Sequence, residues 1–216
     1  AFYFCKSLKK FDIPDSVIFI GRGAFSCCSS LESIRIPSKV AQIGWSAFCE
    51  CISLKTIEID SQQLKEISKF CFQSCCLLEK VKLPPSVSII GESSFEDCAK
   101  LCSIKWSSVE FVDKFAFRNC GELTEVDLKK VCLIGESSFE NCEKLAEVVF
   151  GESLDDVQMD MAAFRNCKSL NNVKLPRNLK VIDWSLFEGC EKLESIDIPS
   201  SVTEICDNAF KECPCL

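Results

Sequence analysis

Apolar residues recur along this chain at an interval of about 23 positions. The heptapeptide Phe-x-x-Cys-x-x-Leu occurs ten times, and its successive phenylalanines are 23, 23, 24, 23, 22, 22, 25, 23 and 23 residues apart. These anchor phenylalanines are Phe2, Phe25, Phe48, Phe72, Phe95, Phe117, Phe139, Phe164, Phe187 and Phe210. Self-similarity at a fixed interval of this size is typical of repeat architectures.

Each interval predicts the same series of short elements. In the second repeat the pattern Leu-x-x-Ile-x-Ile, from Leu31 to Ile36, ends in a period-2 alternation of apolar and polar residues, which predicts a short strand. Pro37 follows and ends the strand, because proline cannot donate to a strand ladder. An extended segment comes next, and then the anchor phenylalanine. Serine and glutamate three residues apart around several anchors, such as Ser93 and Glu96, fit a capping box and predict about one helical turn there.

One repeat cannot bury its apolar face alone, so the repeats are expected to stack. The pattern predicts a single solenoid over residues 1–216, in which about nine short strands form one parallel sheet and short helical or 3-10 turns lie on the opposite side. Its interior should include Ile34, Ile36, Val40, Ile43, Phe48, Cys51 and Leu54. The chain starts and stops inside an anchor segment, so we expect it to be a fragment of a longer repeat array.

The repeat resembles a known family. The stretch LESIRIPSKVAQIGWSAFCECIS, from Leu31 to Ser53, is similar to the repeat of the BspA-like leucine-rich-repeat family, and the resemblance extends over the whole chain. It implies a right-handed leucine-rich-repeat solenoid of the α/β class. It also implies a protein exposed on the cell surface or secreted, associated with adhesion and host contact, and it supplies no catalytic motif. The seventh interval departs from the repeat by two extra residues around Asp155 to Met161.

Composition narrows the function. The formal net charge is −7, so a phosphate backbone would be repelled and nucleic acid is not an expected partner. The chain has no histidine, which excludes His-based triads and His metal sites. The longest apolar runs are only about four residues, so this segment is not expected to insert into a membrane. Phosphate-binding and nucleophile motifs are also missing. We therefore predict no enzyme activity and no cofactor.

The 18 cysteines favour a different location from the family resemblance. Ten occupy the Cys position of the repeat, where small buried thiols pack well. The other eight lie at eight different positions of the repeat, whereas a disulfide framework would place them in recurring pairs. Free thiols are typical of a reducing compartment, so a cytoplasmic location is the alternative. Four thiolates can bind zinc, and the cysteines of the second to fourth repeats are the candidate cluster: Cys27, Cys28, Cys49, Cys51, Cys71, Cys75 and Cys76.

The expected function is protein binding through the open face of the sheet. Along one outward column of the first four strands, the charges of Asp12, Arg35, Glu58 and Lys82 alternate, which predicts ion pairs between neighbouring strands. The alternation fails in repeats six to eight. There we predict a partner-binding patch with an apolar centre and an acidic and amide rim, made of Glu125, Asp127, Glu147, Val149, Asn171 and Asn172.

The nature of the partner stays open between two alternatives. The first is an adhesin or surface antigen that binds a protein, such as a host surface or matrix protein. The second is an intracellular scaffold or interaction module, which the unpaired cysteines favour.

Overall fold

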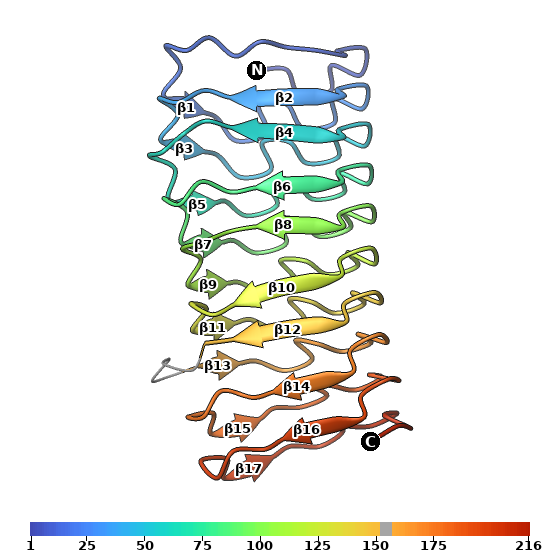
Figure 1. Ribbon diagram of the computed structural model, residues 1–216. Coiled ribbons are helices and arrows are strands. Elements are labelled where there is room, and N and C mark those ends of the chain that lie inside the picture. Colours follow the sequence, from blue (N-terminus) through green and yellow to red (C-terminus); the bar gives the residue numbers. More distant parts are fainter. Residues whose placement is uncertain (152–156) are drawn as a thin grey trace.

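Each repeat forms one rung of an elongated stack, and the N- and C-terminal rungs lie at its two ends (Figure 1). The structure is a computed structural model that describes residues 1–151 and 157–216. Part of the predicted two-residue insertion around Asp155 to Met161 therefore lies outside the described residues.

All paired strands are parallel and belong to two rows. The first row, here called the long-strand row, follows the repeat leucine: β2 (Ser33–Ile36), β4 (Thr56–Ile59), β6 (Lys80–Lys82), β8 (Ser103–Lys105), β10 (Glu125–Leu128), β12 (Glu147–Phe150), β14 (Asn172–Lys174) and β16 (Ser195–Asp197). The short-strand row precedes the anchor: β1 (Phe19–Ile20), β3 (Gln42–Ile43), β5 (Glu66–Ile67), β7 (Ile89–Ile90), β9 (Phe111–Val112), β11 (Leu133–Ile134), β13 (Gln158–Met159), β15 (Val181–Ile182) and β17 (Glu204–Ile205). The predicted parallel strands are confirmed, and the short-strand row is an addition to them.

The anchor segments are not helical, contrary to the capping-box interpretation. No residue of 1–151 or 157–216 is in a helix. Ser93 and Asp97 have left-handed backbones, with φ of 51° and 60°, and most other repeats have left-handed residues at the same two positions. A capping serine has a β-region backbone, and the residues after it continue right-handed. Two left-handed residues around each anchor instead make a series of tight turns.

The hydrogen bonds explain why turns replace the helix. The amides of Ser93, Phe95 and Asp97 donate to carbonyls of the next rung at 2.8 to 3.0 Å. The amides between them close turns within their own rung at 3.1 to 3.3 Å. A helix would use every amide inside the rung and leave none to join neighbouring rungs. Alternate amides therefore bond the stack together on the anchor side.

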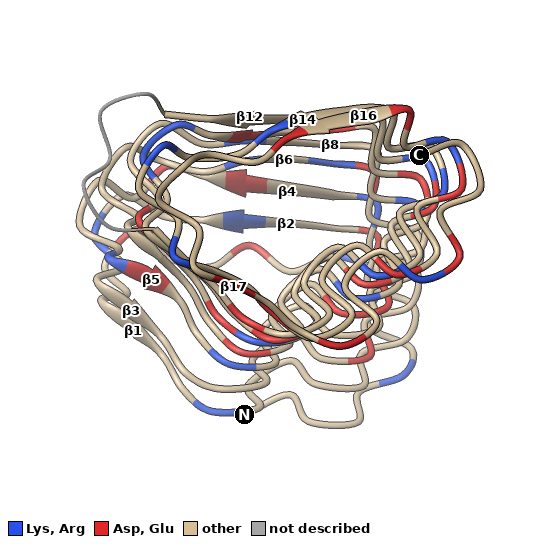
Figure 2. Ribbon diagram, turned by 90° about the horizontal axis from the view of Figure 1, so that it is seen from below, with Lys and Arg blue, Asp and Glu red and all other residues tan. Residues whose placement is uncertain are grey.

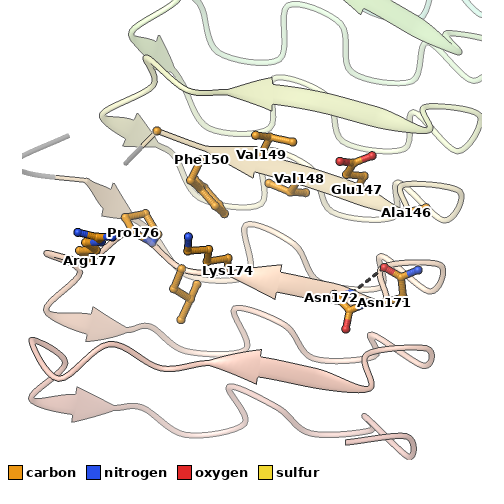
Figure 3. A pocket seen from close by; sticks show the side chains of 12 residues that line it. Ala146, Glu147, Val148, Val149, Phe150, Asn171, Asn172, Lys174, Pro176 and Arg177 are labelled. Atoms are coloured by element: carbon orange, nitrogen blue, oxygen red, sulfur yellow. Dashed lines mark hydrogen bonds between the residues drawn. The ribbon is translucent and has the colours of Figure 1, made fainter. Parts of the chain in front are cut away.

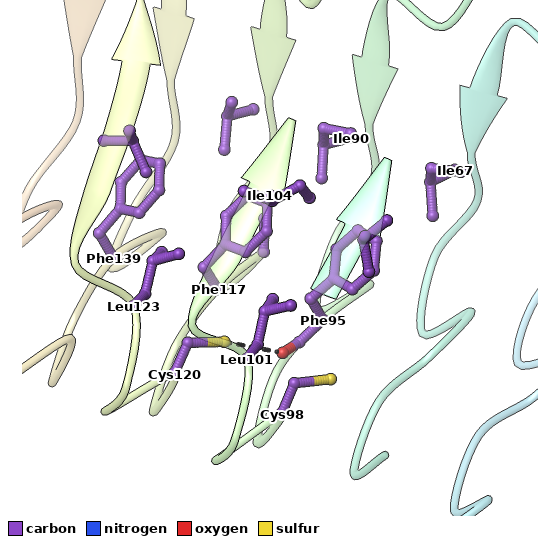
Figure 4. Close-up of a cluster of buried hydrophobic side chains, with 14 of the residues drawn as sticks. Ile67, Ile90, Phe95, Cys98, Leu101, Ile104, Phe117, Cys120, Leu123 and Phe139 are labelled. Atoms are coloured by element: carbon purple, nitrogen blue, oxygen red, sulfur yellow. Dashed lines mark hydrogen bonds between the residues drawn. The ribbon is translucent and has the colours of Figure 1, made fainter. Parts of the chain in front are cut away.

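The anchor phenylalanines form one continuous stack through the core. Their rings lie nearly parallel from Phe25 to Phe210, with centroids of neighbouring rungs 5.2 to 5.8 Å apart. Figure 4 shows how the rings of Phe95, Phe117 and Phe139 pack with Leu101, Leu123 and neighbouring isoleucines. The predicted interior is confirmed: Ile34, Ile36, Val40, Ile43, Phe48, Cys51 and Leu54 are all buried.

The repeat cysteines form a second ladder beside the rings. The thiol of Cys120 donates to the carbonyl of Phe95 in the preceding rung at 3.2 Å (Figure 4). The same bond recurs at each repeat cysteine from Cys28 to Cys213, at 3.1 to 3.4 Å. Burial raises the pKa of Cys51 to about 12, so its thiol stays protonated and can donate. All 18 cysteines are free.

The cysteine ladder predicts a difference between buried and half-exposed thiols. Cys120→Ala removes a buried donor and leaves a small void, so it should lower the free energy of unfolding by about 1–2 kcal/mol. The control is Cys132→Ala, at a half-exposed thiol that bonds the Glu110 carbonyl, and it should change stability by less than about 0.5 kcal/mol. Urea denaturation followed by circular dichroism compares the two. Equal losses in both variants would contradict a stabilising role for the ladder.

Candidate functional site

The long-strand row is interrupted twice. Its strands form three separate ladders, β2-β4-β6-β8, β10-β12 and β14-β16. Within the residues that the structure describes, no strand pairing joins β8 to β10 or β12 to β14. The second break spans the 25-residue interval. At the first, Trp106 occupies the position that Ile36 has in the second repeat. Each break opens a cleft on the outer face of the row.

The first cleft, between β8 and β10, has a volume of about 350 Å³. Trp106 lines it and also bridges the break, because its indole nitrogen donates to the backbone carbonyl of Asp127 in β10. The indole packs on Phe117, with ring centroids 5.7 Å apart. The side chain of Trp106 thus supplies a link between β8 and β10 that the strand ladder does not make. The rest of the lining is mainly charged: Lys105, Glu125, Asp127, Lys129 and Glu147.

The second cleft, between β12 and β14, has a volume of about 570 Å³. Figure 3 shows Phe150 pointing into the space between the strands, with Glu147, Asn171 and Asn172 toward one end and Arg177 toward the other. The side-chain oxygen of Asn171 accepts a 2.7 Å hydrogen bond from the backbone amide of Asn172, which holds the Asn171 side chain at this end of the cleft. The lining therefore runs from acid and amide groups, through apolar groups, to a basic group.

The structure brings the six predicted binding residues together around the clefts. Glu125 and Asp127 line the first, Asn171 and Asn172 line the second, and Glu147 and Val149 line both. Sequence analysis missed further lining residues, among them Trp106, Phe150, Lys174 and Arg177. Only Trp106 carried a signal, since it replaces the usual Ile-Pro of the strand end.

Two acids of the patch face each other on neighbouring strands. Glu125 and Glu147 are register partners on β10 and β12, and both are exposed. Neighbouring parallel strands lie about 4.8 Å apart, so these like charges repel. In the described part of the chain neither glutamate forms an ion pair. Asp127 does have a partner outside its column, Lys129, at 3.5 Å. The repulsion between Glu125 and Glu147 is a cost that folding alone does not explain.

Charges on the anchor side behave differently. Glu188 pairs with Arg165 at 3.6 Å and with Lys211 at 3.0 Å, on the two rungs beside it. Glu92 lies between Lys69 and Lys114, at 3.0 and 3.4 Å; burial alone would raise the pKa of Glu92, but the two lysines lower it. Figure 2 looks along the stack and shows acidic and basic residues of successive rungs gathered at this side. At these positions opposite charges on neighbouring rungs are paired.

In the first strands, the sequence predicts ion pairs between neighbouring residues of one outward column, and this prediction is wrong about the partners. Arg35 binds Asp15 at 2.9 Å and Asp60 at 2.6 Å, and it pairs with neither Asp12 nor Glu58 of its own column. The long guanidinium side chain reaches acids in the segments that flank the strands, where they can turn toward it. Column order alone does not identify such partners.

Residues 1–151 and 157–216 contain neither a metal-binding cluster nor a membrane-spanning helix. No three Cys, Asp or Glu side chains converge in a way that could hold a metal ion, and this includes the candidate cysteine cluster of the second to fourth repeats. The same residues contain no helix long and apolar enough to cross a membrane.

Comparisons with known proteins agree with the fold. The family model described as BspA type Leucine rich repeat region (6 copies) matches residues 1–123 and 103–216. A leucine-rich repeat protein of T. pallidum is 32% identical with a TM-score of 0.66, and the match covers 75% of each chain. A leucine-rich cell surface protein from Faecalibacterium prausnitzii A2-165 is 26% identical with a TM-score of 0.60, over 95% of this chain and 70% of that one. A comparison with curated proteins gives no match.

The bridge across the first break predicts an effect of the indole nitrogen. Trp106→Phe keeps an aromatic ring on Phe117 but removes the donor to the Asp127 carbonyl, so it should destabilise the protein by about 1 kcal/mol. Trp45→Phe is the matched control, because the Trp45 side chain is 52% exposed and its indole donates no hydrogen bond within the described residues. Denaturation midpoints measure both. If the two variants are equally stable, the indole does not hold β8 to β10.

Proposed function

This chain belongs to the BspA type leucine-rich repeat family, and from that premise we propose that it is a non-catalytic protein-binding module. Its binding surface is the long-strand row around the two clefts. The single observation that carries the proposal is that Glu125 and Glu147 face each other beside the apolar lining of the clefts and form no ion pair with a described residue, whereas Glu92 and Glu188 on the anchor side are paired. Solenoids offer extended faces of this kind to other macromolecules.

The chemistry of the surface indicates what the partner presents. Val149 and Phe150 offer an apolar centre, and Glu125, Glu147 and Asn172 surround it with acceptors. Interfaces commonly combine such a core with a polar rim. A protein segment with a basic side chain next to an apolar one would complement this surface, because its cation would relieve the repulsion between the two glutamates.

The adhesion or surface-antigen type is the first form of the proposal. It is supported by the similarity to the F. prausnitzii protein, whose name describes a cell surface location. In this form the chain is exposed at the cell surface or secreted, and its partner is a host surface or matrix protein.

An intracellular scaffold is the second form, and the free thiols favour it. Cys5 and Cys215 are exposed, and seven further cysteines are partly exposed. Thiols that reach solvent persist in a reducing compartment. Alkylation of the natural protein before and after reduction, followed by mass spectrometry, distinguishes the two forms. Free thiols throughout favour the scaffold, and oxidised outer cysteines favour the surface protein.

The binding surface is tested by a triple variant, Glu125→Gln, Glu147→Gln and Val149→Ser. Binding to a panel of purified matrix and cell-surface proteins, measured by surface plasmon resonance, identifies a partner of the unchanged chain. For that partner the triple variant should raise Kd at least about tenfold, because truncating central interface residues costs more than about 1 kcal/mol. Its Tm should stay nearly unchanged, since the substituted side chains make no ion pair or hydrogen bond with any described residue.

A second triple variant controls for the loss of charge itself. Glu32→Gln, Glu58→Gln and Ile18→Ser make the same chemical changes at exposed positions away from the two clefts. This control should bind like the unchanged chain. Unaltered affinity in the cleft variant, or an equal loss in both, would contradict the proposed surface.

A further inference from the structure

The outward side chains of the long-strand row form two columns. The first column consists of Ser33, Thr56, Lys80, Ser103, Glu125, Glu147, Asn172 and Ser195, from β2 to β16. The second column consists of Arg35, Glu58, Lys82, Lys105, Asp127, Val149, Lys174 and Asp197. Strand register fixes these columns within each ladder, for example Lys82 beside Lys105 and Asp127 beside Val149. Across the two breaks, where strands are not paired, a residue is assigned to a column by its distance in sequence from the repeat leucine.

When each column is placed against the same column in reversed strand order, from β16 to β2, charged residues come to lie opposite residues of opposite charge or opposite uncharged residues. In the second column Lys105 and Asp127 are equally far from the middle of the row, and so are Arg35 and Asp197 at its ends. Glu58 and Lys174 form a third such pair of opposite sign. In the first column Lys80 corresponds to Glu147 in the same way. All other correspondences include at least one uncharged residue, so reversal places no like charges together. The middle of the row is the break between β8 and β10.

From this symmetry we propose that the long-strand row binds a second copy of this chain, face to face. A two-fold axis parallel to the strands, passing over the β8–β10 break, reverses the order of the rungs and keeps each column facing itself. Lys105 then meets Asp127 of the second copy, and Lys80 meets Glu147 of the second copy. Because the contact is isologous, each pair occurs twice.

Neighbouring arrangements are electrostatically worse. Moving the axis by half a rung spacing, onto β8, places Lys105 against itself and Arg35 against Lys174. Moving it onto β10 places Asp127 against itself and Glu58 against Asp197. A two-fold axis parallel to the stack would place each rung opposite the same rung of the second copy, with the first column facing the second. Lys80 would then meet Lys82 of the second copy, and Glu125 would meet Asp127 of the second copy. Like charges at such contacts are destabilising, so the charge order selects one register.

The dimensions of the row indicate a weak and salt-sensitive dimer. Eight strands of about four residues cover about 38 Å by 13 Å, from the usual strand spacing and rise. A face of this size gives an interface at the low end of the range for specific complexes. Its central charges are exposed on the single chain, and interactions between exposed charges are screened by salt. The dimer would cover Glu125, Asp127 and Glu147, so it would compete with a partner at that surface; the inference itself does not depend on the proposed function.

A charge exchange tests the contact on the purified chain without any partner. Lys80→Glu with Lys105→Glu makes the four central positions acidic, and Asp127→Lys with Glu147→Lys makes them basic. In sedimentation equilibrium at low salt the unchanged chain should dimerise. Each double variant alone should dimerise at least about tenfold more weakly, because four favourable pairs become repulsive. An equimolar mixture should restore a dimer with Kd within about threefold of the original, since all four pairs are favourable again. Tm and circular dichroism verify that both variants are folded.

Cross-linking provides a measurement that needs no variant. Equal amounts of ¹⁴N- and ¹⁵N-labelled chain, treated with a carbodiimide, should give mixed-isotope cross-links between Lys105 and Asp127 and between Lys80 and Glu147. Raising the salt to about 0.5 M should reduce them strongly. A chain that stays monomeric at high concentration and low salt would overturn the proposal. Dimerisation that both double variants retain, or a mixture that fails to restore it, would overturn it as well.

Discussion

The hydrogen bonds between successive anchor segments hold this structure together. Every second amide around an anchor phenylalanine donates to the next rung, as Phe95 does to Ala116 at 2.8 Å. The left-handed residues on either side of each anchor create the turns that aim these amides along the stack. The phenylalanine rings and the thiol-to-carbonyl bonds of the repeat cysteines follow the same path. Backbone, ring and thiol ladders therefore run side by side from rung to rung.

Because the anchor side is continuous, the long-strand row can be interrupted without dividing the solenoid. The rungs on both sides of the β8–β10 break remain joined through Phe95, Phe117 and Phe139. The long-strand row can therefore contain clefts and like charges on adjacent strands. It can also have a tryptophan side chain, rather than backbone hydrogen bonds, linking two strands. These are features that a sheet responsible for stability would exclude. The same division of roles lets Glu125 and Glu147 face each other on the strand side, where neither forms an ion pair with a described residue, while Glu188 is paired on the anchor side.

The sequence predicts the stack and the core well, because the same apolar pattern recurs in every repeat. An ambiguous position in one repeat can be assigned from the equivalent positions in the others. Phe48, Cys51 and Leu54 are buried as their positions indicate. The helical turn was wrong because Ser93 and Glu96 fit a capping box locally, whereas the choice between turn and helix depends on carbonyls offered by the next rung. The six patch residues were found from broken charge alternation, but the clefts beside them were not. In the described part of the chain the clefts lie where β8 is not paired with β10 and β12 is not paired with β14, and that depends on register between rungs rather than on any single repeat.

Hydrogen exchange of individual amides tests the central claim, that the anchor side carries the stack while the strand row is interrupted. We predict slow exchange for the anchor amides of Phe95, Phe117, Phe139 and Phe164, without a gap at either break. Amides of β10 and β14 that face a break should exchange at least about tenfold faster than amides of β4 and β12, which are paired with the preceding strand. Uniform protection along the long-strand row, or fast exchange of the anchor amides beside a break, would contradict the account.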